Sequence, residues 1–318
     1  PFGELVPGVW GGGLLAGALR EFTAAARSSM PLLLVGATGT GKERMAKAAH
    51  ELSGRNGPFV ALNCGALPEH LAEAELFGYR RGAFTGAERA SLGHFRAAHG
   101  GTLFLDEMPE LSLPLQAKLL RVVEEQRVTG LGETSSVAVD VRIVSASQVV
   151  CAELVTAGRL REDLAARLTG IEQRLPSLSA RRSDIGLLFA HFLNLHSGGR
   201  SPEVEPKLVE ALCLHDWPQN VRELETLTRR LLALHGHESR LALQHLGSEL
   251  SRLVESRAAR TESGKPVARA DYDLARIQRA LGENGGNVKA AADALGISRQ
   301  RVYRLLGKLE VGSDVDSN

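Results

Sequence analysis

The run Pro31-Leu32-Leu33-Leu34-Val35-Gly36-Ala37-Thr38-Gly39-Thr40-Gly41-Lys42-Glu43 decides the fold of this chain. It begins with a continuous apolar stretch, as in a strand that is buried on both faces. A glycine-rich segment follows and leads into a helix-like stretch at residues 44–49. A strand, a glycine-rich loop and a helix with lysine at its start form a P-loop, in which backbone N–H groups and the helix dipole bind phosphate oxygens. The predicted nucleotide-binding residues are Gly36, Ala37, Thr38, Gly39, Thr40, Gly41, Lys42 and Glu43, with Lys42 on the β- and γ-phosphates.

Two adjacent carboxylates complete this site. The general P-loop has serine or threonine after the lysine to hold Mg²⁺, and this chain has Glu43 there, so the metal needs other ligands. Asp106 and Glu107 follow the apolar run at residues 102–105. We expect Asp106 to bind Mg²⁺ and Glu107 to orient and polarise the attacking water. Solvated acids at a strand end are the plainer alternative, and the upstream P-loop disfavours it. The sequence therefore predicts an ATPase.

The apolar pattern around these motifs predicts the fold class. Residues 59–64 and 139–146 have the composition of buried strands, whereas residues 14–29 and 115–123 have helical spacing. Alternating strands and helices indicate an α/β fold with a parallel sheet, helices on both faces, and ligands at the carboxyl ends of the strands.

Composition narrows the class of protein. The chain has 318 residues, room for two or three domains, and a net charge of +1, so any DNA contact must come from a local basic patch. Its three cysteines indicate reduced thiols and a cytoplasmic location, and its ten histidines form no metal-ligand spacing. The longest uncharged run, residues 5–19, is broken by proline and glycine and is too short to span a bilayer, so we expect no membrane association.

The hexapeptide Gly82-Ala83-Phe84-Thr85-Gly86-Ala87 lies between the P-loop and the acidic pair. Its two glycines allow the chain to turn back, which places an aromatic ring and a hydroxyl at an exposed tip. Composition alone favours a hairpin turn whose phenylalanine folds back under the loop.

Taken together, these residues resemble the AAA+ transcription activators of sigma-54 RNA polymerase, the bacterial enhancer-binding proteins, from about residue 2 to residue 309. The resemblance implies an AAA+ ATPase with a helical lid, followed by a Fis-type DNA-binding domain. The hexapeptide at Gly82 is the family's diagnostic loop, so residues 82–87 are expected to contact sigma-54. The resemblance also implies a homo-oligomer, a hexameric ring when active, with ATP and Mg²⁺ as cofactors.

Other roles come from the same resemblance. Asn63 is expected to hold Glu107 and to relay the nucleotide state, and Arg161 and Arg167 are expected to act on the γ-phosphate of a neighbouring subunit. Arg222, in the run Trp217-Pro218-Gln219-Asn220-Val221-Arg222, is expected to face the nucleotide of its own subunit, as is Gln148.

Four departures from the family pattern accompany these matches. The pair Ser147-Gln148 stands where the family has Thr-Asn, and the others are Ala165-Ala166, Gln219 and Ser179. None removes a charged catalytic group, so we expect an active ATPase. A hydrogen bond displaced by about 1 Å can lower a rate on the order of 100-fold. Whether Gln148 slows or uncouples hydrolysis is left open.

The sequence after residue 175 predicts helices and a linker, with no strand pattern. Residues 187–195, 207–214 and 221–234 have helical periods. The predicted domains are an α/β subdomain at 1–175, a helical lid at 176–247, a linker at 248–269 and a helix-turn-helix domain at 270–312. Asn287 and Ser298 begin its two helices, and Gly296 ends the first. The predicted contacts to double-stranded DNA at an enhancer-like upstream site are Ser298, Arg299, Gln300, Arg301, Arg304 and Lys308.

Three hypotheses follow. The first is a motor that hydrolyses ATP to convert the closed sigma-54 promoter complex to the open one. The second is a DNA-binding regulator that uses ATP only for assembly, and the third is a DNA remodeller such as a branch-migration motor, which the intact hexapeptide disfavours. The inducing signal and the target promoters leave no trace in these residues.

Overall fold

The structure, a computed structural model, describes residues 2–199 and 201–247. The predicted linker and helix-turn-helix domain, with the residues predicted to contact DNA, lie outside the described residues. Among the described residues, no helix is both long and apolar enough to cross a membrane.

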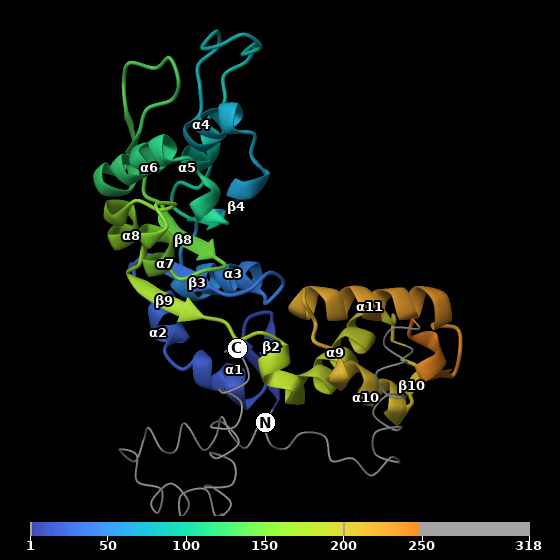
Figure 1. The fold of residues 1–318 in the computed structure, drawn as a ribbon. Helices are drawn as coiled ribbons and strands as arrows, with labels where there is room; N and C mark the ends of the chain where they lie inside the picture. The colour runs from blue at the N-terminus through green and yellow to red at the C-terminus, as the bar shows by residue number, and fades with distance from the viewer. Residues whose placement is uncertain (1, 200, 248–318) are drawn as a thin grey trace, which may run out of the picture. The chain divides into compact units, whose positions relative to one another are not determined.

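A sheet of five parallel strands forms the centre of the first subdomain, in the order β4-β5-β8-β3-β9. Its strands are β3 (Leu32–Val35), β4 (Phe59–Asn63), β5 (Thr102–Asp106), β8 (Arg142–Ser147) and β9 (Ile171–Arg174). The predicted parallel α/β sheet is thereby confirmed. Figure 1 shows helices on both sides of it. The carboxyl ends of its strands meet at one edge, which is where ligands bind in such sheets.

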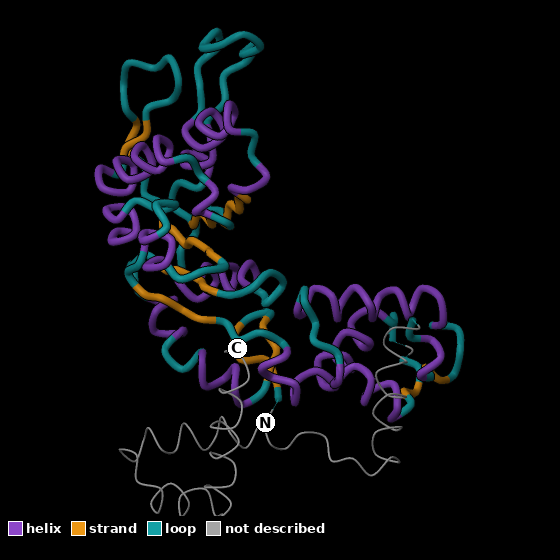
Figure 2. Tube along the Cα trace, viewed as in Figure 1, coloured by secondary structure: helices purple, strands orange, loops and turns teal. Residues whose placement is uncertain are grey.

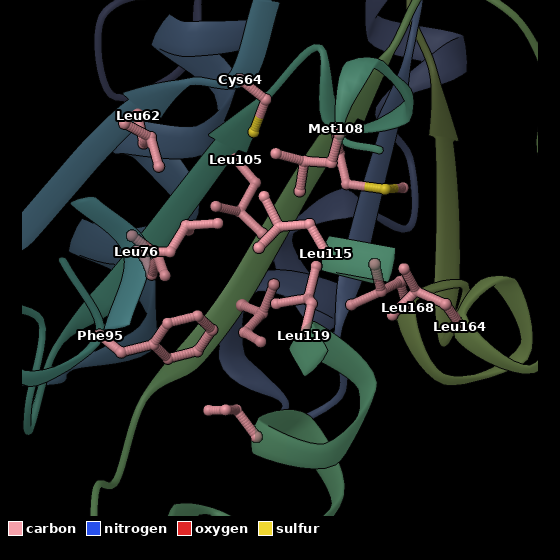
Figure 3. Packing of buried hydrophobic residues seen from close by; sticks show 14 of the residues in the cluster. Leu62, Cys64, Leu76, Phe95, Leu105, Met108, Leu115, Leu119, Leu164 and Leu168 are labelled. Carbon is pink, nitrogen blue, oxygen red and sulfur yellow. The ribbon is translucent and has the colours of Figure 1, made fainter. Parts of the chain in front are cut away.

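Alternate side chains of the strands enter two cores, one on each face of the sheet. Leu33 and Leu105 pack with α4 (Glu69–Phe77), α5 (Gly93–Ala97), α6 (Leu113–Glu125), α7 (Cys151–Thr156) and α8 (Glu162–Leu168). In Figure 3, Leu105 of β5 lies among Leu76, Leu115 and Leu119. Leu32 and Leu34 pack on the opposite face with α1 (Gly13–Ala18), α2 (Phe22–Arg27) and α3 (Lys42–Ser53).

The N-terminal region differs from the single helix predicted at residues 14–29. A two-stranded antiparallel sheet, β1 (Gly3–Val6) and β2 (Val9–Gly11), comes first. The helical stretch then divides into α1 and α2, because the chain turns at residues 19–21. The turn brings Leu19 and Phe22, both buried, into the same core.

The second subdomain is helical, as predicted. It contains α9 (Ile185–His196), α10 (Pro206–Leu214) and α11 (Asn220–His235). The short strands β10 (Glu203–Val204) and β11 (Arg240–Leu241) and the 3₁₀ turns η3 (Ser179–Asp184) and η4 (Leu243–His245) complete it. In the first subdomain, η1 (Cys64–Ala66) and η2 (Met108–Glu110) follow β4 and β5.

Two long loops extend beyond α4, α5 and α6, and Figure 2 shows both in teal. The first loop, residues 78–92, connects α4 to α5 and contains the hexapeptide. The second loop, residues 129–136, joins β6 (Arg127–Val128) to β7 (Val137–Ala138). Tyr79 pairs with both Ser91 and Leu131, so the two loops are hydrogen-bonded at their bases.

Candidate nucleotide-binding and catalytic site

The P-loop residues form a tight turn between β3 and the start of α3. Gly39 and Gly41 have φ values of +76° and +107°, which favour glycine. Gly39 is required for a second reason, since a Cβ there would overlap the carbonyl oxygen of Gln219. Thr40 closes the turn, with its Oγ1 donating to Ala37 O at 2.8 Å. Because α3 begins at Lys42, its free N–H groups and its dipole favour an anion at this turn.

Lys42 extends back into the loop and is 8% exposed. Its Nζ donates to Gly36 O at 2.6 Å and to Ala37 O at 3.3 Å. Burial lowers the pKa of this ammonium, and the nearby charges of Asp106 and Glu107 oppose the effect. A buried cation that is held only by carbonyl oxygens is suited to a phosphate, because an anion restores the charge pairing that burial removed.

The two predicted carboxylates lie opposite Lys42. Asp106 ends β5, and its Oδ1 accepts a hydrogen bond from Glu107 N at 3.0 Å. Burial raises the pKa of Asp106, while Lys42 acts to lower it. Glu107 has a left-handed backbone, with φ 52° and ψ 39°, a conformation that is uncommon for a residue other than glycine and is concentrated at functional sites.

Lid residues complete the cleft. The N-terminus of α11 contacts the P-loop, because Gly39 O accepts hydrogen bonds from Val221 N at 3.0 Å and Arg222 N at 3.3 Å. Asn220 Nδ2 donates to Thr38 O at 2.8 Å. The resulting cleft of about 210 Å³ is lined by the P-loop, by Asn63 and both carboxylates, and by Arg222. The structure thus brings most of the predicted nucleotide and catalytic residues to one place.

The hydrogen-bond partner of Glu107 is not the expected Asn63. Asn63 Oδ1 accepts from Gly65 N at 2.9 Å and Ala66 N at 3.2 Å, which caps η1. Glu107 Oε1 instead accepts from Gln148 Nε2 at 3.1 Å. The expected hydrogen bond between Asn63 and Glu107 is not formed in the described part of the chain, and Gln148 does not line the nucleotide cleft.

Arg161 and Arg167 lie away from the cleft of their own chain. Arg161 Nη2 pairs with Asp163 Oδ2 at 2.7 Å, and Arg167 Nε pairs with Glu124 Oε1 at 3.1 Å. Both side chains are exposed. Neither arginine lines the cleft formed by the P-loop, so a contact with a phosphate would have to be made in another subunit.

Two positioning residues escaped the sequence reasoning. Gln116 is fully buried, and its amide joins three backbone groups: Nε2 donates to Leu111 O at 2.8 Å and Arg159 O at 2.9 Å, and Oε1 accepts from Arg161 N at 3.0 Å. It therefore ties the segment that carries Arg161 to the turn after Glu107. The second positioning residue is Asn220. Its Oδ1 accepts a hydrogen bond from Leu178 N at 2.7 Å, and its Nδ2 donates to Thr38 O, so it joins the lid to the P-loop. Its left-handed φ of 53° is a signal that sequence does not display.

The hexapeptide forms a compact turn with an open surface. Gly82 N donates to Ala87 O at 2.9 Å, and Ala87 N donates to Phe84 O at 3.0 Å. Gly82 and Gly86 have positive φ values, and no atom lies within 4 Å of the position of an added Cβ. The Phe84 side chain is 37% exposed, and its ring centroid lies 5.0 Å from that of Tyr79.

The second loop supports the first. Leu131 N donates to Gly78 O at 2.8 Å, and Arg80 N donates to Leu131 O at 3.1 Å. Glu133 also forms an ion pair with Arg96 of α5, through Arg96 Nη1 to Oε1 at 3.0 Å. No local sequence motif marks residues 129–136.

One cluster in the lid has the residue types of a metal site. His235 Nδ1 lies 2.9 Å from Glu238 Oε1, and His245 Nε2 lies 3.2 Å from Glu238 Oε2. However, the two rings are stacked with an angle of 10° between their planes, so their lone pairs do not converge. In addition, Ala242 N donates to His245 Nδ1 at 3.0 Å, which leaves the proton on Nε2. The arrangement suits two imidazoles that share one carboxylate.

Comparison with known proteins covers nearly the whole chain. Residues 13–173 match the sigma-54 interaction domain, residues 179–263 the AAA+ ATPase lid domain, and residues 268–309 the Fis family of bacterial regulatory proteins. The chain is 40% identical over 302 residues to the putative uric acid sigma-54-dependent transcriptional regulator UacR of Escherichia coli strain K12, a match that covers 90% of this chain and 51% of UacR.

Two further similarities extend this result. The transcriptional regulatory protein ZraR of Salmonella typhimurium is 40% identical over 296 residues, covering 91% of this chain and 66% of ZraR. The crystal structure of NtrX from Brucella abortus in complex with ATP aligns with a TM-score of 0.68 and 31% identity, covering 95% of this chain and 69% of NtrX. The chain therefore spans about half the length of UacR and about two thirds of ZraR and NtrX.

Proposed function

The chain belongs to the sigma-54-dependent transcriptional regulators, and from this premise we propose that it is an ATP-driven activator. It binds ATP in the cleft beside Lys42, hydrolyses it, and uses the resulting conformational change to convert the closed sigma-54 promoter complex to the open one. The observation that supports this best is the convergence of Lys42, Asp106, Glu107 and Arg222 on a single cleft.

The cleft residues fit ATP together with Mg²⁺. Asp106 and Glu107 offer the hard oxygen ligands that Mg²⁺ prefers, and partial burial raises the pKa of Asp106, an effect that the charge of Lys42 opposes. Asp106 would hold the metal. When bound, Mg²⁺ would supply neutralisation of the charge that develops on the phosphate oxygens. The crystal structures of NtrX with ATP and with ADP support nucleotide binding by this fold.

Each polar side chain has a distinct role in hydrolysis. Lys42 contacts the β- and γ-phosphates, and Glu107 orients and polarises the attacking water. Arg222 faces the nucleotide from the lid of the same subunit. Arg161 and Arg167 act on the γ-phosphate of a neighbouring subunit, which requires that the chains assemble as a ring, hexameric when active. The exposure of both arginines supports this assignment.

The output of the motor is the hexapeptide loop. Phe84 and Thr85 contact sigma-54, and the exposed face of Phe84 supports this role, because an exposed aromatic ring is suited to a protein interface. Target selection falls to residues 270–312, through base and phosphate contacts by Ser298, Arg299, Gln300, Arg301, Arg304 and Lys308. The match of residues 268–309 to the Fis family supports DNA binding there.

Replacement of Phe84 tests the proposal. Because a central aromatic contact is worth about 2 kcal/mol or more, Phe84→Ala should lower open-complex formation at a sigma-54 promoter by about 30-fold or more. ATP hydrolysis and DNA binding should stay within about twofold of the native chain. The matched control is Leu195→Ala, which removes an exposed apolar side chain of the lid. Normal open-complex formation by the Phe84 variant would contradict the proposed output.

An ATPase assay separates this proposal from a regulator that uses ATP only for assembly. The native chain, concentrated on DNA that carries its binding site, should hydrolyse ATP. If it binds ATP and assembles but shows no turnover, the assembly role is correct and the motor role is wrong.

A further inference from the structure

The carboxylate of Glu107 lies between two side-chain amides. Glu107 follows β5, whose neighbours in the sheet are β4 and β8. Asn63 ends β4, and Gln148 comes directly after β8. The sheet order therefore supplies one amide on each side of the carboxylate, and the two amides differ in what they contact.

Gln148 is the amide that holds Glu107. Its Nε2 donates to Oε1 at 3.1 Å. Because an ionised carboxylate only accepts hydrogen bonds, this contact also fixes which end of the amide faces Glu107. Asn63 uses its Oδ1 to accept from Gly65 N and Ala66 N at the start of η1.

This hydrogen bond joins Glu107 to a side chain that lies outside the nucleotide cleft. Gln148 lines a separate hollow of about 150 Å³, together with Ser147, Glu110 and Arg159. Glu107 is the residue that lines both this hollow and the nucleotide cleft. Its side chain can therefore turn toward either space, and the contact with Gln148 favours the space that lies outside the nucleotide cleft.

We propose that Gln148 is a positioning residue that restrains Glu107, so that hydrolysis requires release of this hydrogen bond and rotation of the carboxylate into the nucleotide cleft. The inference rests on the proposed role of Glu107 in polarising the attacking water. Side-chain length is essential to it, since asparagine at position 148 would be one methylene shorter and would fall short of Oε1. Gln148 thus lowers the basal rate without contacting the nucleotide.

Two shortened variants of the full chain, Gln148→Asn and Gln148→Ala, provide the first test. Each should raise the kcat of basal ATP hydrolysis by about fivefold to tenfold, the effect expected from loss of one hydrogen bond to a partly exposed carboxylate. The Kd for ATP should not change, and loss of this one hydrogen bond should lower the Tm by no more than about 4 °C. Gln244→Ala, at an exposed glutamine of the lid, is the matched control and should leave kcat unchanged.

A charged variant gives a signature that a purely structural role would not produce. Gln148→Glu places a second carboxylate beside Glu107, and two such groups at this distance share a proton at low pH and repel each other at high pH. The acid limb of the kcat profile should therefore move to higher pH by about 1 unit or more relative to the native chain. An unshifted profile would contradict direct contact between the two side chains.

The outcomes separate this inference from the proposed function. If the native chain hydrolyses ATP but Gln148→Ala hydrolyses it more slowly, Gln148 assists Glu107 and the restraint is wrong. If Gln148→Ala changes the Kd for ATP and leaves kcat unaltered, Gln148 is a nucleotide contact and the restraint is again wrong. If neither chain hydrolyses ATP, the proposed function fails and the inference fails with it.

Discussion

The P-loop at the base of the nucleotide cleft and the hexapeptide loop belong to the same subdomain, yet different interactions hold them. In the cleft, Lys42 is buried with two carbonyl partners, and Gly39 is enclosed by the lid. In the loop, Gly82 has open space around it, and Phe84 keeps 37% of its surface exposed. The phosphate-binding part of the cleft is therefore preorganised to hold an anion, whereas the loop is held by a few backbone hydrogen bonds and by the contact of Phe84 with Tyr79.

Matched alanine substitutions at two glycines test this contrast most severely. Gly39→Ala forces a Cβ against Gln219 O in a left-handed residue, so the lid cannot dock and we expect the affinity for ATP to fall by more than about 100-fold. Gly82→Ala meets no neighbouring atom and carries only backbone strain of about 1–2 kcal/mol. Calorimetry should find ATP affinity within about twofold of the native value for Gly82→Ala. Equal losses in the two variants would show that the contrast is wrong.

Gln116 extends the comparison to buried polar groups. Gln116→Leu keeps the apolar volume but removes the partner of Leu111 O, Arg159 O and Arg161 N. Leaving buried backbone groups without partners should lower the free energy of unfolding by about 1–3 kcal/mol. Hydrolysis should fall as well, because the segment that carries Arg161 loses its anchor.

Urea denaturation and an ATPase assay measure both effects of Gln116→Leu. The control is Gln244→Leu, in an exposed position of the lid. An unchanged midpoint for Gln116→Leu would mean that Arg161 is positioned by other contacts.

Replacement of Asp106 should have the smallest effect on the free energy of unfolding, and this effect depends on pH. Burial raises its pKa above the ordinary value of 3.8, so the folded chain binds this proton more tightly than the unfolded chain does. The stabilisation is complete below about 3.8 and is lost as the pH rises through the folded pKa. At neutral pH without Mg²⁺, the ionised carboxylate is therefore a net cost.

Asp106→Asn in EDTA should accordingly raise the free energy of unfolding at pH 7 by about 0.5 kcal/mol once solvent screening is allowed for. The gain should disappear at acid pH, and saturating Mg²⁺ and ATP should reverse the order by stabilising the native chain. Thermal unfolding at several pH values measures this difference. A less stable variant at pH 7 in EDTA would contradict the cause given for the pKa shift.

The predicted residues that the structure brings together in the cleft are those that local sequence marks. Lys42 follows a strand and a glycine-rich turn, and Asp106 ends an apolar run, so each carries its own context. The parallel α/β class and the lid helices follow from apolar periodicity in the same way. These features need no knowledge of which residues meet across the fold.

The features that escaped prediction depend on contacts between distant segments. Gln116 forms hydrogen bonds with Arg159 and Arg161, which are separated from it by 43 and 45 positions in the chain. The sequence around Gln116 gives no sign of these contacts. β9, an edge strand of the sheet, has the sequence IEQR. Three of its four residues are polar, so the apolar pattern did not predict a strand there. Glu107 is hydrogen-bonded to Gln148 and not to the expected Asn63. This partner depends on the side chain of Gln148, which is one methylene longer than asparagine, and on the position of β5 between β4 and β8.

Binding of sigma-54 in the presence of an ATP transition-state analogue tests the central claim most directly, because it joins the cleft to the loop in one experiment. We predict that the native chain binds sigma-54 with the analogue and not without nucleotide, and that Phe84→Ala binds the analogue but not sigma-54. Binding of sigma-54 that is independent of the analogue, or is retained by Phe84→Ala, would contradict the claim that the cleft drives the loop.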